Sequence, residues 1–408
     1  MTRFELLHRP GAPTLAARLV LPLGSRQDPV GAAGRQQLLA GVLTRGCGDL
    51  GAEAVADLVE NRGAQLRCEA GDDLLVLALR CAGDDADQLL PLLLTMAEAP
   101  RLEGAQVERE RHLNLQTLQR LQEDPFHRCH ERLRRQLYGQ GPYGHDPLGV
   151  ASDLAAISAD ALSVAARDLP AGDAVLVLAG DPPPGLIEAI TTRFASWRAP
   201  SAPGRPLDPP AADPLETVEL DTEQAVVMVG FRTVPLSHPD LLPLRLLQVH
   251  LAVGMSSRLF QQLREERGLA YEIGVDLSAR QEASPCLWYL STGAPRLAEA
   301  IDALEAEWQR VLTLPLSDDE LALARAKLRG QDCLSSETAS QRADRLALLL
   351  GHGLPADHNE RALARLEQLE PEDLRAAANR WLTQPMLSVC GPGRALARVR
   401  PLAPAPPR

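Results

Sequence analysis

The chain has 408 residues, of which 45% are hydrophobic and 24% charged, a composition typical of globular proteins with room for more than one core. Its formal net charge of -12 argues against a nucleic-acid partner, because phosphate binding needs a basic surface. The sequence contains no run of about 18 apolar residues, so no membrane-spanning helix is expected. The N-terminus lacks a signal-peptide apolar region, and the seven widely spaced cysteines form no C-x-x-C pair, which predicts a cytoplasmic protein with free thiols.

Hydrophobic spacing in the first half predicts strands and helices in alternation. The segments that read as strands are 14–23, 64–70, 74–81 and 174–180. Helices are expected from near Gly34, in the segment that Gly63 closes, and over 84–97, 105–122, 126–138 and 159–168. Residues 197–214 are proline-rich and lack periodicity, so we interpret them as a linker.

The second half repeats this plan. Strands are predicted at 216–231, 270–278, 285–292 and 386–391, and helices at 240–252, 257–267, 296–313, 317–332, 337–350 and 371–382. Leu58-Val-Glu-Asn-Arg-Gly-Ala in the first half parallels Leu263-Arg-Glu-Glu-Arg-Gly-Leu in the second. We therefore expect two duplicated α+β domains, 1–196 and 215–400, each an antiparallel sheet packed with helices. The proline-rich tail 401–408 is expected to be disordered.

The stretch from Gly254 to Leu277 reads as a helix, a glycine stop and a strand. Gly268 fits the position where a left-handed residue ends a helix. Arg264 falls in the last helical turn and Tyr271 at the start of the strand, so both side chains could face one space. The alternation from Tyr271 to Leu277 places this tyrosine on the apolar face, which favours a buried core residue as the alternative.

Three segments in order along the chain carry a family resemblance. They are Gly24-Ser-Arg-Gln-Asp-Pro up to Gly34; Val107-Glu-Arg-Glu-Arg111 with Leu137-Tyr-Gly-Gln-Gly-Pro-Tyr143; and Ser256-Ser-Arg-Leu-Phe up to Tyr271. Together they resemble the pitrilysin/insulinase family of zinc peptidases from about residue 4 to residue 392. The resemblance implies the family's fold of two similar α+β domains joined by a linker.

Active members of this family carry His-x-x-Glu-His on one helix. Two histidines four residues apart bind zinc, the glutamate activates the metal-bound water, and a glutamate on a later helix completes the site. The corresponding positions here hold Gln37, Ala40 and Gly41, and the later helix offers Gln116, Thr117 or Leu118. Because none of these side chains replaces the missing ligands, the resemblance implies that this chain holds no zinc of its own.

In two-chain members of the family, the silent chain supplies an arginine and a tyrosine that hold the substrate backbone. The resemblance carries these roles onto Arg264 and Tyr271, whose first-half counterparts are Val59 and Leu66. It therefore implies a catalytically silent subunit that forms a heterodimer with a zinc-bearing partner and helps to bind a peptide substrate. Processing of a precursor peptide, such as that of pyrroloquinoline quinone, is one possible context.

Two alternatives stay open at this point. The first is a scaffold or peptide-binding protein of the same fold that has no role in proteolysis. The second is an independent peptidase with an unusual metal site at His127 and His130, where Cys129 and Glu131 lie beside them. A polar helix face explains that cluster more simply.

Overall fold

The computed structural model describes residues 2–198 and 205–404. Part of the predicted linker (199–204) and of the predicted disordered tail (405–408) lies outside the described residues. The described chain forms two compact units that do not follow it as two consecutive blocks. Unit 1 consists of Met1–Gln119, Gly141–Leu207 and Cys333–His358, and unit 2 of Arg120–Gln140, Asp208–Asp332 and Asn359–Arg408.

The sheet of unit 1 has the strand order β1-β5-β2-β4-β3. Its strands are β1 (Arg3–His8), β2 (Thr14–Leu21), β3 (Gln65–Ala70), β4 (Leu75–Ala82) and β5 (Val175–Gly180). The predicted α+β class is confirmed, but the predicted all-antiparallel sheet is wrong at one pair, because β1 and β5 run parallel. More than 160 residues separate these two strands, and a connection of that length permits the parallel direction.

The sheet of unit 2 repeats this topology in the order β6-β10-β7-β9-β8, again with one parallel pair, β6 and β10. Its strands are β6 (Leu215–Glu219), β7 (Gln224–Arg232), β8 (Glu272–Leu277), β9 (Pro285–Gly293) and β10 (Met386–Gly391). The predicted single strand 216–231 is two strands, because a turn around Asp221 and Thr222 interrupts it. Two sheets with the same strand order are what a duplicated sequence plan predicts.

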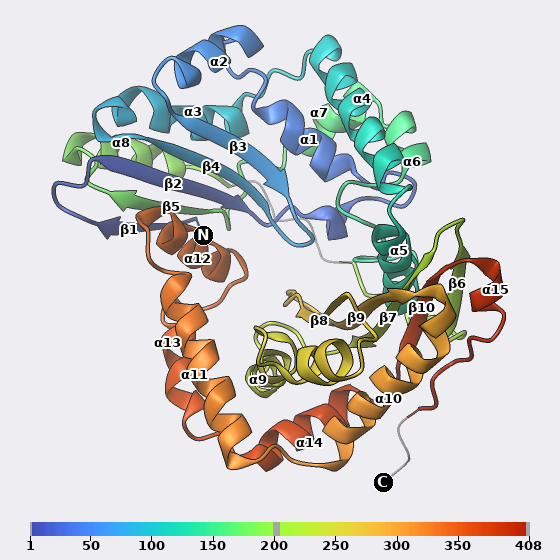
Figure 1. The fold of residues 1–408 in the computed structure, drawn as a ribbon. Coiled ribbons are helices and arrows are strands. Elements are labelled where there is room, and N and C mark those ends of the chain that lie inside the picture. Colours follow the sequence, from blue (N-terminus) through green and yellow to red (C-terminus); the bar gives the residue numbers. More distant parts are fainter. Residues whose placement is uncertain (1, 199–204, 405–408) are drawn as a thin grey trace. The chain divides into compact units, whose positions relative to one another are not determined.

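Helices pack against both sheets (Figure 1). Unit 1 holds α1 (Arg35–Leu43), α2 (Ala52–Glu60), α3 (Ala86–Glu98), α4 (Gly104–Leu121), α6 (Ala151–Ala156), α7 (Ala159–Ala166), α8 (Pro184–Phe194) and α12 (Ala339–Gly351). Unit 2 holds α5 (Pro125–Tyr138), α9 (Leu241–Ala252), the π-helix η3 (Phe260–Glu266), α10 (Leu297–Thr313), α11 (Asp318–Leu334), α13 (His358–Leu366), α14 (Pro371–Trp381) and α15 (Gly393–Leu396). Each unit has its own apolar core, dominated by leucine.

Two helices cross between the sequence halves, and we call them the exchanged helices. Helix α12 comes from the second half but packs against β2 and β5 of unit 1, whereas α5 comes from the first half and packs against β7 and β10 of unit 2. Figure 1 shows α12, coloured for the second half, beneath the strands of unit 1. Small residues Ala343 and Ala347 of α12 are fully buried against Val20 and Val177, which lets the helix lie close to the sheet.

The exchanged helix α12 ends at a histidine that lies in a buried polar cluster. Among the described residues the Nδ1 atom of His352 has no hydrogen-bond partner, and it lies 4.0 Å from the Asp73 carboxylate. Tyr143, which adopts a positive φ of 68°, donates a hydrogen bond of 2.5 Å to the same carboxylate. Burial lowers the pKa of His352, and the nearby Arg26 guanidinium lowers it further, while the Asp73 carboxylate opposes both.

This lowered pKa predicts a loss of stability in mild acid. Below about pH 6.5 His352 takes up a proton in the unfolded chain but not in the folded chain. The free energy of unfolding therefore falls as the pH is lowered, until the pH reaches the lowered pKa of His352 in the folded state. We expect a loss of up to about 1.4 kcal/mol per pH unit in that window. Urea unfolding at several pH values between 8 and 5, of the wild type and of His352→Gln, measures this pH dependence. Burial also lowers the pKa of His250, so the difference between the two proteins isolates His352. Equal pH dependence in both proteins would contradict the prediction.

Candidate functional site

The candidate site is built on the turn between η3 and β8. Leu259 and Leu263 are fully buried and anchor η3 to the core of unit 2. Gly268 has a φ of +56°, its N–H donates to the Arg264 carbonyl at 3.1 Å, and the next N–H, that of Leu269, donates to Leu263 at 2.7 Å. These bonds close the helix as the sequence predicted, because glycine adopts the left-handed conformation without a Cβ clash.

The turn brings Arg264 and Tyr271 together. The guanidinium carbon of Arg264 lies 5.5 Å from the centre of the Tyr271 ring and 4.8 Å from that of Phe260. Tyr271 is 79% exposed, so the alternative of a buried core tyrosine is wrong. Strand β8 begins only at Glu272, and Tyr271 lies in the bend before it, where the alternation of the strand does not yet fix the side chain.

These side chains line an open hollow of about 400 Å³. The lining residues are Ala252, Gly254, Met255, Phe260, Arg264, Tyr271, Glu272 and Ile273. Within the described residues Arg264 has no carboxylate partner, and two aromatic rings hold its guanidinium instead. Its N–H donors and the Tyr271 hydroxyl can therefore bind a carbonyl oxygen of a ligand that lies in the hollow.

Phe260 is a site residue that the sequence analysis did not assign. It lies four residues before Arg264, and residues at this spacing share one face of a helix. That spacing was the available signal, but helical spacing also places Phe260 beside Leu259 and Leu263, which favours a core position. The structure instead leaves Phe260 half-buried beside the hollow, under the guanidinium.

The positions predicted to correspond to the family's zinc helix lie on α1. The side chain of Gln37 accepts a hydrogen bond of 3.0 Å from the Ala70 N–H, and Ala40 is fully buried. Next to Gly41 lies the carboxylate of Glu110 from α4, which forms an ion pair with Arg45, with 2.5 Å between Nη2 and Oε2. An arginine–glutamate pair therefore occupies the space beside Gly41.

This packing predicts a penalty for any side chain at position 41. A Cβ on Gly41 would lie 2.3 Å from Oε1 of Glu110, and Arg45 holds that carboxylate in place. We expect Gly41→Ala to lower the free energy of unfolding by about 1–3 kcal/mol, the usual cost of overpacking. Urea unfolding measures the loss. If the cause is the Glu110 carboxylate, Gly41→Ala costs less in a Glu110→Ala background, and equal costs in both backgrounds would contradict this explanation.

The later helix offers no substitute ligand at the three predicted positions. Leu118 is buried, the Thr117 hydroxyl donates to the Leu113 carbonyl at 2.9 Å, and Gln116 is exposed. Across residues 2–198 and 205–404, no three His, Cys, Asp or Glu side chains gather closely enough to hold a metal ion.

The histidine cluster on α5 is part of the packing of unit 2. Cys129 points into the sheet, where its thiol is fully buried and donates to the Ser388 carbonyl at 3.1 Å. Burial raises the pKa of this thiol to about 12, so it stays protonated and is a poor metal ligand. Glu131 forms an ion pair of 2.9 Å with Arg135 on the same helix. The simpler interpretation, a helix with one packed and one polar face, therefore fits His127 and His130 better than a metal site.

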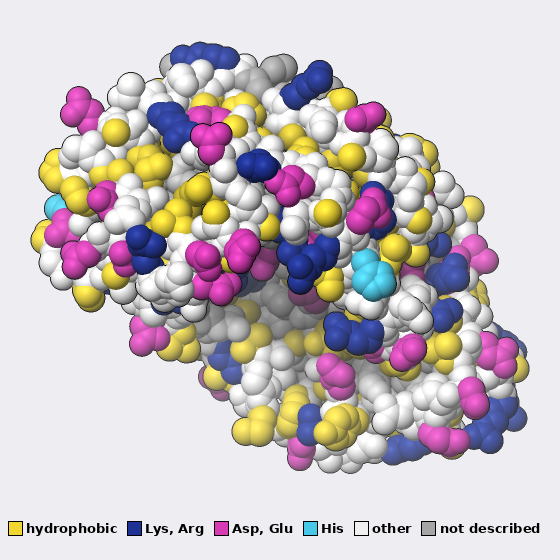
Figure 2. Space-filling view, turned by 90° about the horizontal axis from the view of Figure 1, so that it is seen from above, with side chains coloured by type: hydrophobic (Ala, Val, Ile, Leu, Met, Phe, Trp, Pro, Cys, Tyr) yellow, Lys and Arg dark blue, Asp and Glu magenta, His cyan; other side chains and the backbone are white. Residues whose placement is uncertain are grey.

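The surface view agrees with the mixed charge of the sequence. On the face drawn in Figure 2, basic and acidic side chains are interspersed, with hydrophobic side chains between them. No helix in the described residues has both the length and the hydrophobicity needed to cross a membrane. All seven cysteines are free thiols.

Comparisons with known proteins place the two halves in one peptidase family. Residues 3–149 match the family described as insulinase (peptidase family M16), and residues 170–328 match the peptidase M16 inactive domain. An uncharacterized zinc protease of Bacillus subtilis is 23% identical over 373 residues, which cover 90% of this chain and 91% of that protein. A relative from Helicobacter pylori, named a non-peptidase homolog, is 23% identical over 349 residues, which cover 84% of this chain and 80% of that protein.

Among solved structures, a peptidase M16 inactive domain from Pseudomonas fluorescens has the same fold. It superposes with a TM-score of 0.86 at 23% sequence identity and covers 95% of each chain.

Proposed function

Since the chain belongs to the insulinase family of peptidases, family M16, we propose that it is the catalytically silent subunit of a two-chain zinc metallopeptidase. In this proposal Arg264 and Tyr271 bind and orient the backbone of a peptide substrate. A zinc-bearing subunit of the same family supplies the metal and the general base. The identities of Gln37, Ala40 and Gly41, none of which is a zinc ligand, support the silent role.

One observation carries the proposal. Arg264 and Tyr271 are held together and exposed at a hollow, with no carboxylate partner in the part of the chain that the structure describes, while Gln37, Ala40 and Gly41 on α1 offer no zinc ligand. An exposed arginine stacked on two rings is pre-organised at little entropic cost, and its donors are in place before a ligand arrives. Such donors stabilise the negative charge that develops on a carbonyl oxygen during peptide hydrolysis.

A second candidate function is a scaffold or peptide-binding protein without a role in proteolysis. The relative named as a non-peptidase homolog supports it, as does the Arg45–Glu110 pair beside the family's zinc position. The hollow with Arg264 and Tyr271 would then hold a peptide without cleaving it.

We further propose that the complex works in a reducing, cytoplasmic compartment and trims a precursor peptide. The seven free thiols support the first part, since disulfides are common in oxidising compartments. Peptide maturation, for example of a cofactor such as pyrroloquinoline quinone, is a biological context compatible with a peptide-binding hollow.

Reconstitution with a zinc-bearing family member from the same genome tests the proposal. We expect the two chains to co-purify as a heterodimer with one zinc ion per pair, and to cleave peptides that this chain alone leaves intact. Full peptidase activity of the partner alone, unchanged on addition of this chain, would favour the scaffold function. Zinc bound by this chain alone at one equivalent would overturn both candidates.

A further inference from the structure

A second cavity lies beside the candidate site. It has a volume of about 140 Å³ and is lined by His250, Ser256, Arg258, Gln261, Gln262, Glu320, Leu323, Ala324 and Lys327. Gly254 and Met255 line the hollow of Arg264, whereas Ser256 and Arg258, on the same segment, line this cavity. The two cavities therefore share the short segment 254–258 but have different walls.

Lys327 is the only lysine of the whole chain, which uses arginine for its other basic side chains. The two residues are not equivalent. An ammonium is a compact charge with three donors, whereas a guanidinium is a planar fork suited to flat, two-pronged contacts. Lys327 therefore brings a compact point charge to this cavity.

The charges around the cavity leave one cation without a counter-ion. Arg258 is neutralised by Glu307, with 2.5 Å between Nε and Oε2 and 3.1 Å between Nη2 and Oε1. His250 lies 3.9 Å from Glu320 (Nε2 to Oε1), but burial lowers the pKa of His250, so at neutral pH this histidine does not neutralise the carboxylate. Within the described residues Lys327 forms no ion pair, and one of its donors binds the Val253 carbonyl at 2.7 Å.

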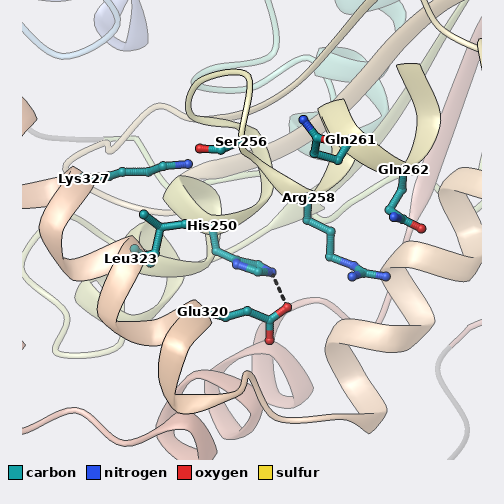
Figure 3. A pocket seen from close by; sticks show the side chains of 9 residues that line it. His250, Ser256, Arg258, Gln261, Gln262, Glu320, Leu323 and Lys327 are labelled. Atoms are coloured by element: carbon teal, nitrogen blue, oxygen red, sulfur yellow. Dashed lines mark ion pairs between the residues drawn. The ribbon is translucent and has the colours of Figure 1, made fainter. Parts of the chain in front are cut away.

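Lys327 lines the cavity with its ammonium group. Figure 3 shows its ammonium and the Ser256 hydroxyl pointing toward one another, with His250 below them and Arg258 farther away. Loss of solvent around Lys327 lowers the pKa of its amine. An anion in the cavity would supply the missing charge.

We propose that this cavity binds a small carboxylate, held by the ammonium of Lys327 and the hydroxyl of Ser256. A monoanion fits better than a dianion such as phosphate, because Lys327 offers a single positive charge and the Glu320 carboxylate, which lines the same space, repels a second negative charge. The cavity size admits a molecule such as acetate, or the carboxylate end of a larger ligand. This proposal does not depend on the proposed function.

The chain itself offers a sharp test, because its amines are Lys327 and the α-amino group. We expect acetate to protect Lys327 from acetylation by an N-hydroxysuccinimide ester, as measured by peptide mass spectrometry, at constant ionic strength set by chloride. With acetate about tenfold above its dissociation constant, the labelling rate of Lys327 should fall about tenfold, while that of the α-amino group stays unchanged. Equal rates with and without acetate would overturn the proposal.

Variants and a second anion complete the test. Ser256→Ala should lose much of the protection, whereas Arg329→Met, which removes a positive charge from α11 outside the cavity lining, should keep it. The rise in Tm that acetate causes should disappear in Lys327→Met and remain in Arg329→Met. Stronger protection by phosphate than by acetate would overturn the assignment to a carboxylate.

Discussion

Replacing Arg264 with alanine is expected to lower the turnover of the reconstituted complex about 100-fold, the usual effect of removing one donor to a developing oxyanion. The guanidinium is fixed over the rings of Phe260 and Tyr271, so its loss removes a pre-organised donor from the hollow. Heterodimer assembly should be unchanged, because the side chain is exposed and makes no ion pair within the described residues. Steady-state peptidase assays and size-exclusion chromatography measure the two properties.

Matched variants separate this role from a general loss of charge. Arg267→Ala removes an exposed arginine from the same turn and should leave turnover near the wild-type value. Tyr271→Phe keeps the ring under the guanidinium and removes only the hydroxyl, so it reports on the second donor alone. Wild-type turnover in Arg264→Ala and in Tyr271→Phe would refute the role of the pair and leave the scaffold function standing.

Replacing Asp344 with alanine is expected to lower the free energy of unfolding by about 3 kcal/mol. Asp344 lies on the exchanged helix α12 and pairs with Arg18 of β2, whose side chain is only 2% exposed. Arg18 also donates to the Ser340 hydroxyl at 2.6 Å and to the Ala17 carbonyl at 2.9 Å. Loss of the carboxylate leaves this guanidinium buried without a counter-charge. Urea unfolding measures the effect.

A double variant shows whether the loss of stability in Asp344→Ala comes from the unpaired, buried guanidinium of Arg18. Arg18→Met with Asp344→Leu removes both charges and should be markedly more stable than Asp344→Ala alone, since well-packed apolar residues can replace a buried pair. Glu5→Ala breaks an exposed pair with Arg3 and should cost less than about 1 kcal/mol. If Asp344→Ala costs no more than Glu5→Ala, the pair does not hold α12 on unit 1.

The local elements of the fold could be predicted because their signals lie within a few residues. The glycine at 268 ends η3 where expected, and periodicity placed β3, β4, β9 and most helices within about two residues of their observed bounds. That Gln37, Ala40 and Gly41 cannot bind zinc stays a prediction from residue identity.

Other features depend on contacts between distant segments, which periodicity does not encode. The apolar face of α12, with Ala343 and Ala347, predicts that the helix is packed but not which sheet it covers. The Glu110 carboxylate beside Gly41 joins two helices about 70 residues apart. The exposure of Tyr271 depends on where β8 begins, and strand bounds are the weakest part of a pattern-based prediction.

The exchanged helices also set the order in which the chain can mature during its synthesis. The last strand of unit 1 ends at Gly180, but α12, which covers one face of that sheet, begins at Ala339, about 160 residues later. At typical translation rates the face formed by Val20, Val175 and Val177 stays open to water for roughly ten to thirty seconds. Helix α5 is synthesised before the strands β7 and β10 that it packs against, so its apolar face waits for its sheet. The nascent chain is therefore most prone to aggregate while its second half is being made, and neither half can complete its unit without the other.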